Sequence, residues 1–199
     1  ARGRAAVGAR LASPLLQPFG LVERALARRS SYPLGVSAVT LREVTDDNRD
    51  AIVGVRVAPD QKRFVGTVAG ALMDAQEIPE GKPWYRAVYV DDQPVGFVML
   101  SWNVTPEPPR IIGPWFLWKL LIDEQHQGRG YGRETVRLVA DIVRANGAAE
   151  LVTSCVPGPD GPERFYRSIG FNPTGELAEN GDFALGNGSS VVAGARAAA

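Results

Sequence analysis

The sequence has little of what several protein classes require. It contains a single cysteine, Cys155, among 199 residues, which excludes an internal disulfide and favours a reducing compartment. We therefore expect a cytoplasmic protein. It also contains no run of about 18 apolar residues, so we expect no segment that crosses a membrane. We expect no bound metal.

The overall charge is zero, but the charges are unevenly distributed. Basic and acidic residues number 22 each, yet residues 1–35 carry six arginines and one acid, Glu23. The rest of the chain is therefore mildly acidic. An acidic body argues against a nucleic-acid partner and suits a cationic or amine-bearing one.

The chain divides into three predicted parts. Residues 1–35 are rich in alanine and arginine and are interrupted by Pro14, Pro18 and Pro33, so they form a basic N-terminal extension that is disordered or loosely docked. A targeting segment is the alternative for this stretch. Residues 36–187 form one globular domain, and residues 188–199 form a flexible C-terminal tail.

The first half of the domain alternates between strand and helix patterns. Residues 36–45 are β-branched and alternating, which predicts a strand, and Thr45 is a plausible N-cap for a short helix over 46–56. A second helix is predicted to open at Asp60, and residues 84–90 and 95–102 flank the turn DDQP of a hairpin. The apolar face of that second helix is expected to comprise Phe64, Val65, Val68, Ala69, Leu72 and Met73.

The second half contains the expected centre of the sheet. Residues 111–122 are apolar on both faces, which favours a central strand covered by helices on either side. A helix follows, with Val136, Val139, Ala140 and Val143 on one face and a stop at Asn146-Gly147. A strand over 150–156, a short helix over 161–170 and strands over 170–176 and 182–185 complete the domain. The order predicts an α/β (α+β) fold in three layers, with a mixed, mostly antiparallel sheet of six or seven strands flanked by helices.

The stretch QGRGYG, residues 127–132, lies between the central strand and the following helix. Such a turn aims several backbone N–H groups and the positive end of the helix dipole at one place, which binds phosphate or pyrophosphate. Arg129 and Arg133 could add charged contacts. A Walker loop is excluded because no lysine follows these glycines, and the G-x-G-x-G spacing differs from the dinucleotide fingerprint. A plain tight turn with solvated arginines is the alternative.

Two motifs carry a resemblance to a known family. The pattern of Gln127, Gly130 and Gly132, preceded by LLIDEQH, resembles the acetyl-CoA-binding signature of the GCN5-related N-acetyltransferases (GNAT). The segment RFYRSIGF, residues 164–171, resembles the second signature of that superfamily. The resemblance covers residues 36–185. Within the superfamily, QKRFV, YRAVYVDDQPVGFVML and GPERFYRSIGFNPTGE look like the bacterial spermine/spermidine (diamine) N-acetyltransferase branch.

The resemblance implies an acetyl-CoA site and one catalytic residue. The backbone of Leu120, Leu121 and Ile122 would pair with the pantetheine arm, and Tyr166 would donate a proton to the departing thiolate. A core tyrosine beside Phe165 is the alternative for Tyr166. The base is not evident, since Lys119 is the only ionisable residue between Trp115 and Ile122, and His126 is not favoured for that role. The remaining cofactor-binding residues would be Gln127, Gly128, Arg129, Gly130, Tyr131, Gly132, Arg133 and Phe165. Pro159 stands where many members have an asparagine, seven residues before the tyrosine, so an additional contact to the pantetheine region is in doubt.

The acceptor implied by the resemblance is a primary amine, with a polyamine such as spermine or spermidine as the first hypothesis. A polyamine needs spaced carboxylates and an apolar or aromatic wall. The candidates for these are Trp84, Tyr85, Glu77, Glu80 and Glu176, with Asp74, Glu179, Asp182 and Trp102 as further ones, although exposed acids are usually only solvated. Trp115 and Trp118 are expected in the core.

The function implied by the resemblance is direct acetyl transfer from acetyl-CoA to a primary amine in a ternary complex. An aminoglycoside, an amino acid or a protein amine is the alternative acceptor. A non-catalytic acyl-CoA-binding sensor is the alternative from another class. A homodimer is the expected assembly.

Overall fold

The computed structural model describes residues 38–107, 111–156, 161–177 and 183–186, with the side chains of 176, 177, 183 and 184 outside the description. The chain separates into two units, residues 1–34 and 35–199, and every described residue belongs to the second. The predicted N-terminal extension and C-terminal tail lie outside the described residues.

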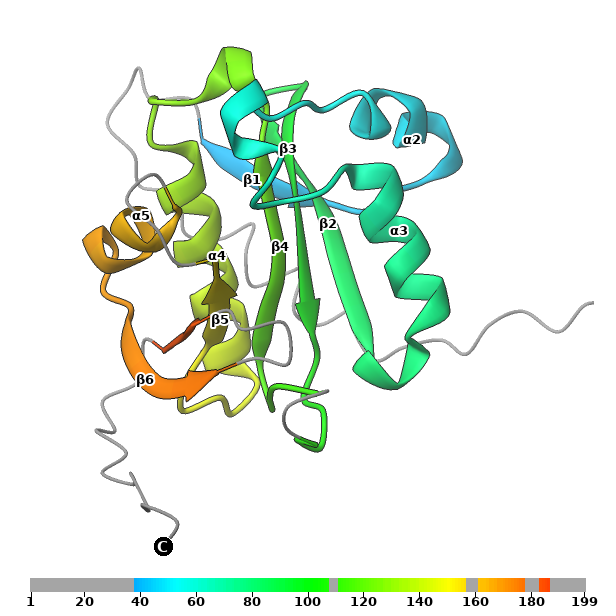
Figure 1. Cartoon of the computed structure of the whole chain (residues 1–199). Helices are drawn as coiled ribbons and strands as arrows, with labels where there is room; N and C mark the ends of the chain where they lie inside the picture. The colour runs from blue at the N-terminus through cyan, green and yellow to red at the C-terminus, as the bar shows by residue number, and fades with distance from the viewer. Residues whose placement is uncertain (1–37, 108–110, 157–160, 178–182, 187–199) are drawn as a thin grey trace, which may run out of the picture. The chain divides into compact units, whose positions relative to one another are not determined.

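The described chain is built on a seven-stranded sheet in the order β1-β2-β3-β4-β5-β7-β6 (Figure 1). All neighbouring strands are antiparallel except β4 and β5, which are parallel, so the predicted mixed, mostly antiparallel sheet is confirmed. The strands are β1 (Val39–Arg42), β2 (Pro83–Val90), β3 (Gln93–Ser101), β4 (Phe116–Ile122), β5 (Val152–Cys155), β6 (Asn172–Leu177) and β7 (Phe183–Gly186). The predicted hairpin is β2–β3.

Helices cover both faces of this sheet. They are α2 (Asp46–Val53), α3 (Val68–Glu77), α4 (Tyr131–Ala145) and α5 (Glu163–Ser168), with 3₁₀ turns η1 (Pro59–Gln61), η2 (Pro79–Gly81) and η3 (Glu124–His126). Ala87 and Tyr89 of β2 join the core cluster beneath α2 and α3. Val88 and Val90 alternate with them and so face the other side, and α4 contacts β1 and β4. The three predicted layers are therefore present.

Helix α4 follows its predicted pattern closely. The predicted apolar positions Val136, Val139, Ala140 and Val143 are all buried. On the exposed face, Arg137 pairs with Glu134 and Asp141, each at 2.7 Å. The helix ends at Ala145 with Asn146 as its C-cap, followed by Gly147 with φ 87°. An amphipathic stripe of this length leaves only one face to bury, which is why the sequence predicts it well.

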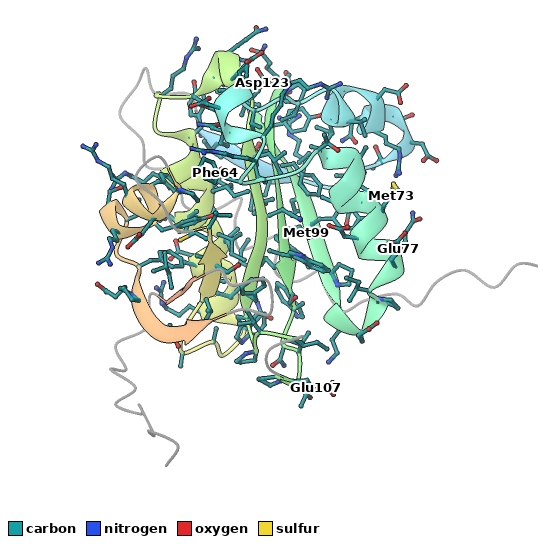
Figure 2. The ribbon with its side chains drawn as sticks, in the orientation of Figure 1. Phe64, Met73, Glu77, Met99, Glu107 and Asp123 are labelled. Atoms are coloured by element: carbon teal, nitrogen blue, oxygen red, sulfur yellow. The ribbon has the colours of Figure 1, made fainter. Side chains whose placement is uncertain are left out.

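The predicted start of the second helix, at Asp60, is wrong. Helix α3 begins at Val68, where the Thr67 hydroxyl accepts a hydrogen bond from the Gly70 N–H at 3.1 Å. Thr67 is therefore an N-cap, and Phe64 and Val65 before it lie in the turn after η1 rather than on the helix face. Met73, expected on the apolar face, is 58% exposed. Figure 2 labels its side chain on α3.

The central strand is also shorter than predicted. β4 begins at Phe116, after a cis peptide bond between Gly113 and Pro114, and Ile111 forms only an isolated bridge with Glu107. The pairing with β3 shifts register near Trp118, which is a β-bulge. Leu117 and Leu121 of β4 are buried, and its other residues are intermediate in exposure.

Candidate functional site

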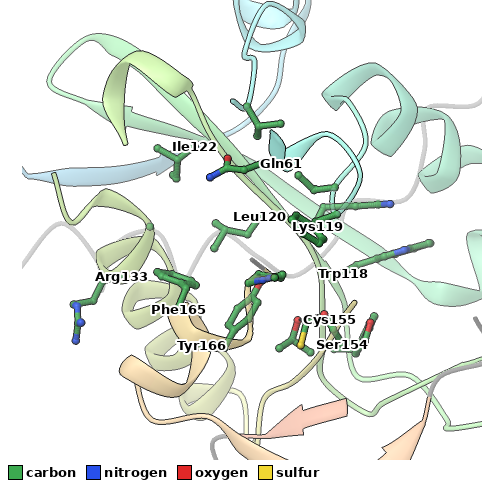
Figure 3. Close-up of a pocket in the computed structure, with 18 of the residues that line it drawn as sticks. Gln61, Trp118, Lys119, Leu120, Ile122, Arg133, Ser154, Cys155, Phe165 and Tyr166 are labelled. Carbon is green, nitrogen blue, oxygen red and sulfur yellow. Dashed lines mark hydrogen bonds between the residues drawn. The ribbon is translucent and has the colours of Figure 1, made fainter. Parts of the chain in front are cut away.

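The central feature of the site is a fork between β4 and β5. The two strands pair only at Phe116↔Val152 and Leu117↔Thr153, whereas β4 continues to Ile122. A cavity of about 1100 Å³ lies at this fork (Figure 3). An unpaired strand edge can accept an extended ligand as a substitute strand. Leu120 and Ile122 line the cavity, while the Leu121 side chain is buried in the core cluster beneath α2 and α3, so only its backbone could reach a ligand.

The glycine turn forms one end of the same cavity. Gly128 and Gly130 have φ of 74° and 83°, a conformation that favours glycine, and Gly130 is the N-cap of α4. The first N–H groups of α4 have no acceptor within the helix, and the dipole of this 15-residue helix adds partial positive charge. The cavity-lining residues of this end are Gln127, Gly128, Gly130, Tyr131, Gly132 and Arg133. The arrangement is suited to an anion.

The two arginines of the turn differ in position. Arg133 lines the cavity and donates to the Ser168 carbonyl at 3.2 Å, which connects α4 to α5. Arg129 donates to the Gln125 carbonyl at 3.1 Å and is not among the described lining residues. Phe165 lies against Gly132, because a Cβ there would be 3.4 Å from the Phe165 ring.

A pair of glutamines braces the turn. Gln127 and Gln61 exchange two amide hydrogen bonds, of 2.8 and 3.1 Å, and Gln127 also donates to the Ile122 carbonyl at 2.9 Å. The Gln127 side chain therefore links η1 to the end of β4. Sequence reasoning missed Gln61, since nothing local marks a partner 66 residues away.

Tyr166 of α5 faces the cavity from beneath Phe165. It is 7% exposed, and its ring contacts those of Phe165 and Phe171 at centroid distances of 5.1 and 5.4 Å. Burial raises the pKa of Tyr166 to about 12, although a hydrogen bond with the Thr153 side chain opposes the rise. The phenol is therefore protonated at neutral pH. The buried Thr153 hydroxyl also donates to the Leu117 carbonyl at 3.0 Å, so it lies where the fork opens. Thr153 is a second residue that sequence reasoning missed.

His126 is held at the end of β4 by its neighbour Asp123. Its side chain is 14% exposed, and its Nδ1 lies 3.5 Å from Asp123 Oδ1. Burial alone would raise the pKa of Asp123, but hydrogen bonds from the backbone N–H groups of Arg56 and Gln125, together with the nearby His126 ring, lower it overall. Asp123 thus anchors the loop after α2, with both backbone bonds at 3.1 Å.

The other half of the cavity is largely apolar and lies between β4, η2 and the segment before α3. Trp118 is half-buried and packs on Gly81, where a Cβ would be 3.3 Å from its ring. It therefore belongs to the cavity wall as well as to the core predicted for it. Lys119 Nζ lies 3.3 Å from Asp74 Oδ2 of α3. The described lining residues of this half are Phe64, Val65, Ile78, Gly81, Ser101, Ile111, Ile112, Phe116, Trp118 and Lys119.

The predicted acceptor residues are not gathered here. Trp84 packs against Trp102 at a centroid distance of 5.5 Å, and Tyr85 stacks on Phe97 at 5.9 Å. Glu77 and Glu80 are exposed, and none of these four is among the described residues that line the cavity. The side chain of Glu176 lies outside the description. In the part of the chain that is described, no cluster of His, Cys, Asp and Glu could hold a metal. None of the described helices has the length and apolar character needed to cross a membrane.

Comparisons with known proteins agree with this architecture. Spermine/spermidine N(1)-acetyltransferase of Bacillus subtilis is 28% identical over 146 residues, which cover 73% of this chain and 95% of that protein. The crystal structure of an acetyltransferase from Thermus thermophilus superposes with a TM-score of 0.55 at 22% identity, covering 75% of this chain and 96% of that one. An aminoglycoside acetyltransferase crystallised with coenzyme A superposes with a TM-score of 0.61 at 16% identity, covering 76% and 95%.

The family model for the acetyltransferase (GNAT) family matches residues 69–171, which is just over half of the chain and spans α3, the forked strands, the glycine turn and Tyr166. The chain belongs to the GNAT acetyltransferase family.

Proposed function

We propose that the protein transfers the acetyl group of acetyl-CoA directly to a primary amine of a small molecule. One observation carries this proposal. A single cavity joins the anion-suited turn at the start of α4, the open edge of β4 and the phenol of Tyr166.

The residues present fit acetyl-CoA. Backbone N–H groups of residues 127–132 would hold the pyrophosphate, and the edge of β4 at Leu120 and Ile122 would pair with the amides of the pantetheine arm. Acetyl-CoA supplies the thioester whose carbonyl carbon the amine attacks, so that a C–N bond forms and the C–S bond breaks. Gln127 would keep the turn and the strand in register through its bonds to Gln61 and Ile122.

Tyr166 would act as the proton donor to the departing sulfur. Its raised pKa of about 12 keeps a proton on Oη, and its position beside the fork faces the space where the thioester would lie. Thr153 would hold the phenol and could donate to it once the proton has left.

The amine must also lose a proton. Keeping a primary amine neutral at pH 7 costs about 4 kcal/mol, because its pKa of about 10.4 lies roughly three units higher. The described cavity wall contains no carboxylate, so we propose that this proton leaves through water and not to an acidic side chain.

A polyamine is one candidate for the acceptor amine. A polyamine is the acceptor named for the curated relative, and that name is its support here. The described cavity wall supplies no carboxylate to meet its ammonium groups. Cytoplasmic location and a homodimer likewise stay predictions.

Thiol release from acetyl-CoA over a panel of amines tests the proposal. The panel comprises spermine, spermidine, simple alkylamines, arylalkylamines, amino acids and an aminoglycoside, with coenzyme A binding measured by calorimetry. Release with at least one amine supports acetyl transfer, and mass spectrometry identifies the N-acetyl product. Tight coenzyme A binding without release for any amine would instead support the acyl-CoA-binding sensor.

A further inference from the structure

We infer that the acceptor is a primary monoamine with an apolar, preferably aromatic, body, and that Trp118 and the Asp74–Lys119 pair select it against polyamines. This inference rests on the proposed acetyl transfer and names the substrate class of the same site. It comes from the half of the cavity opposite Tyr166, which Figure 3 shows with Trp118 and Lys119 on one side and Phe165 and Tyr166 on the other.

The wall of this half is apolar over most of its surface. Trp118 lies at the bulge of β4, and it packs on Gly81 and against the core cluster, so its ring is held from behind. Phe64 and Ile78 come from the segments flanking α3 and line the same half. A bound body with a flat or branched hydrocarbon surface would bury apolar area here, and aromatic pairs add a further gain.

The charges in this half do not suit a polycation. Asp74 already pairs with Lys119 at 3.3 Å, and Lys119 is the partner that lines the cavity. An incoming ammonium group would therefore have to compete with a resident ammonium for the same carboxylate. Among the described residues that line this half, the charged side chain is that of Lys119, which is basic.

A polyamine that presents one neutral amine to the thioester still carries its other ammonium groups. Those groups need carboxylates at matching distances, whereas the described wall offers hydrocarbon and the Lys119 ammonium. A monoamine becomes uncharged on losing its proton, so it leaves no buried charge without a partner.

The test compares kcat/KM for phenethylamine and tryptamine with that for spermidine and for butylamine. The kcat/KM for the aromatic amines should exceed that for spermidine by at least about tenfold. Trp118→Ala should lower kcat/KM for the aromatic amines by about tenfold and for butylamine by less than about threefold, and Trp118→Phe should restore most of the loss. Lys119→Met leaves Asp74 available to an ammonium group. It should therefore raise kcat/KM for spermidine, relative to that for phenethylamine, by about tenfold.

Coenzyme A affinity is measured for each variant to separate a folding defect from a change in specificity. The side chains of Trp118 and Lys119 lie away from the glycine turn that would hold the pyrophosphate, so a correctly folded variant should keep that affinity. A kcat/KM for spermidine equal to or higher than that for phenethylamine in the wild type would overturn the inference while leaving acetyl transfer intact. An unchanged preference in both Trp118→Ala and Lys119→Met would also overturn it. Absence of thiol release with every amine would instead refute the proposed function.

Discussion

The replacement Tyr166→Phe tests the proposed proton donor with little change in packing. It removes one hydroxyl group and keeps the ring between Phe165 and Phe171. Proton donation by a positioned side chain typically accelerates a step by about 10²–10⁴-fold. We therefore expect Tyr166→Phe to lower kcat by about 100-fold, the lower end of that range.

The pH dependence of this loss follows from the same reasoning. The proton comes from the Tyr166 hydroxyl and not from the solvent, so the ratio of wild-type to variant kcat should stay nearly constant between about pH 7 and 9. Tyr166 itself stays protonated throughout that range, since burial raises its pKa to about 12. Ionisation of Tyr166 should therefore not limit activity below pH 10.

Stability gives a second readout. Because the pKa of Tyr166 in the folded protein lies above its ordinary value of 10.0, the folded state favours the neutral phenol. The contribution of this group to the free energy of unfolding is complete below pH 10 and is lost as the pH rises through about 12. The Phe variant should lack this loss in alkaline denaturation.

Tyr89→Phe is the matched control, because Tyr89 has the same 7% exposure but belongs to the core beneath α2 and α3. Stopped-flow thiol detection at saturating substrates measures kcat, and calorimetry measures coenzyme A affinity. If kcat of Tyr166→Phe equals that of the wild type throughout pH 7 to 9, as is expected for Tyr89→Phe, the assignment of Tyr166 is refuted.

Three further substitutions test the turn, the fork and the strand packing. Gly130→Ala places a side chain at φ 83°, which costs about 1 kcal/mol, and should weaken coenzyme A binding by about fivefold in calorimetry. Thr153→Val removes the hydroxyl that contacts Tyr166 and Leu117 and should lower kcat by about fivefold, but much less in the Tyr166→Phe background. Gly96→Ala drives a Cβ into the Leu121 carbonyl oxygen and should lower the free energy of unfolding by about 1–3 kcal/mol in urea titrations.

Each of these three has a control within the chain. Gly147→Ala imposes the same strain at φ 87° beyond the end of α4 and should leave coenzyme A binding unchanged. Thr153→Ser keeps the hydroxyl and should retain most of the activity. Gly66→Ala meets no atom within 4 Å and should be tolerated. Equal coenzyme A affinities for Gly130→Ala and Gly147→Ala would contradict the role of the turn. Losses in kcat that add up in the double variant of Thr153 and Tyr166 would contradict their coupling. A Gly96→Ala variant as stable as the wild type would contradict the close packing of β3 on β4.

Local patterns in the sequence accounted for much of the fold. The amphipathic stripe of α4, the turn Asp91-Asp92 between β2 and β3 and the glycine turn at 127–132 each depend on neighbours within a few residues. Their periodicity and turn chemistry therefore predict them directly. The same approach failed at Asp60, because the helical spacing of Phe64 and Val65 continued across the cap at Thr67, and a pattern of apolar residues does not show where hydrogen bonding begins.

The sequence by itself determined the family, the order of the elements and the turn suited to a pyrophosphate, because these features are carried by short contiguous motifs. Only the tertiary structure decided where β4 and β5 part, that Gln127 joins Gln61 and that Thr153 contacts Tyr166. It also shows that Trp118 lines the cavity, whereas Trp84 and the exposed glutamates are not among the described residues that line it. The physical reason is that these contacts join segments distant in the chain, such as the 66 residues between Gln61 and Gln127, and a β-bulge redirects side chains in a way that strand alternation cannot reveal.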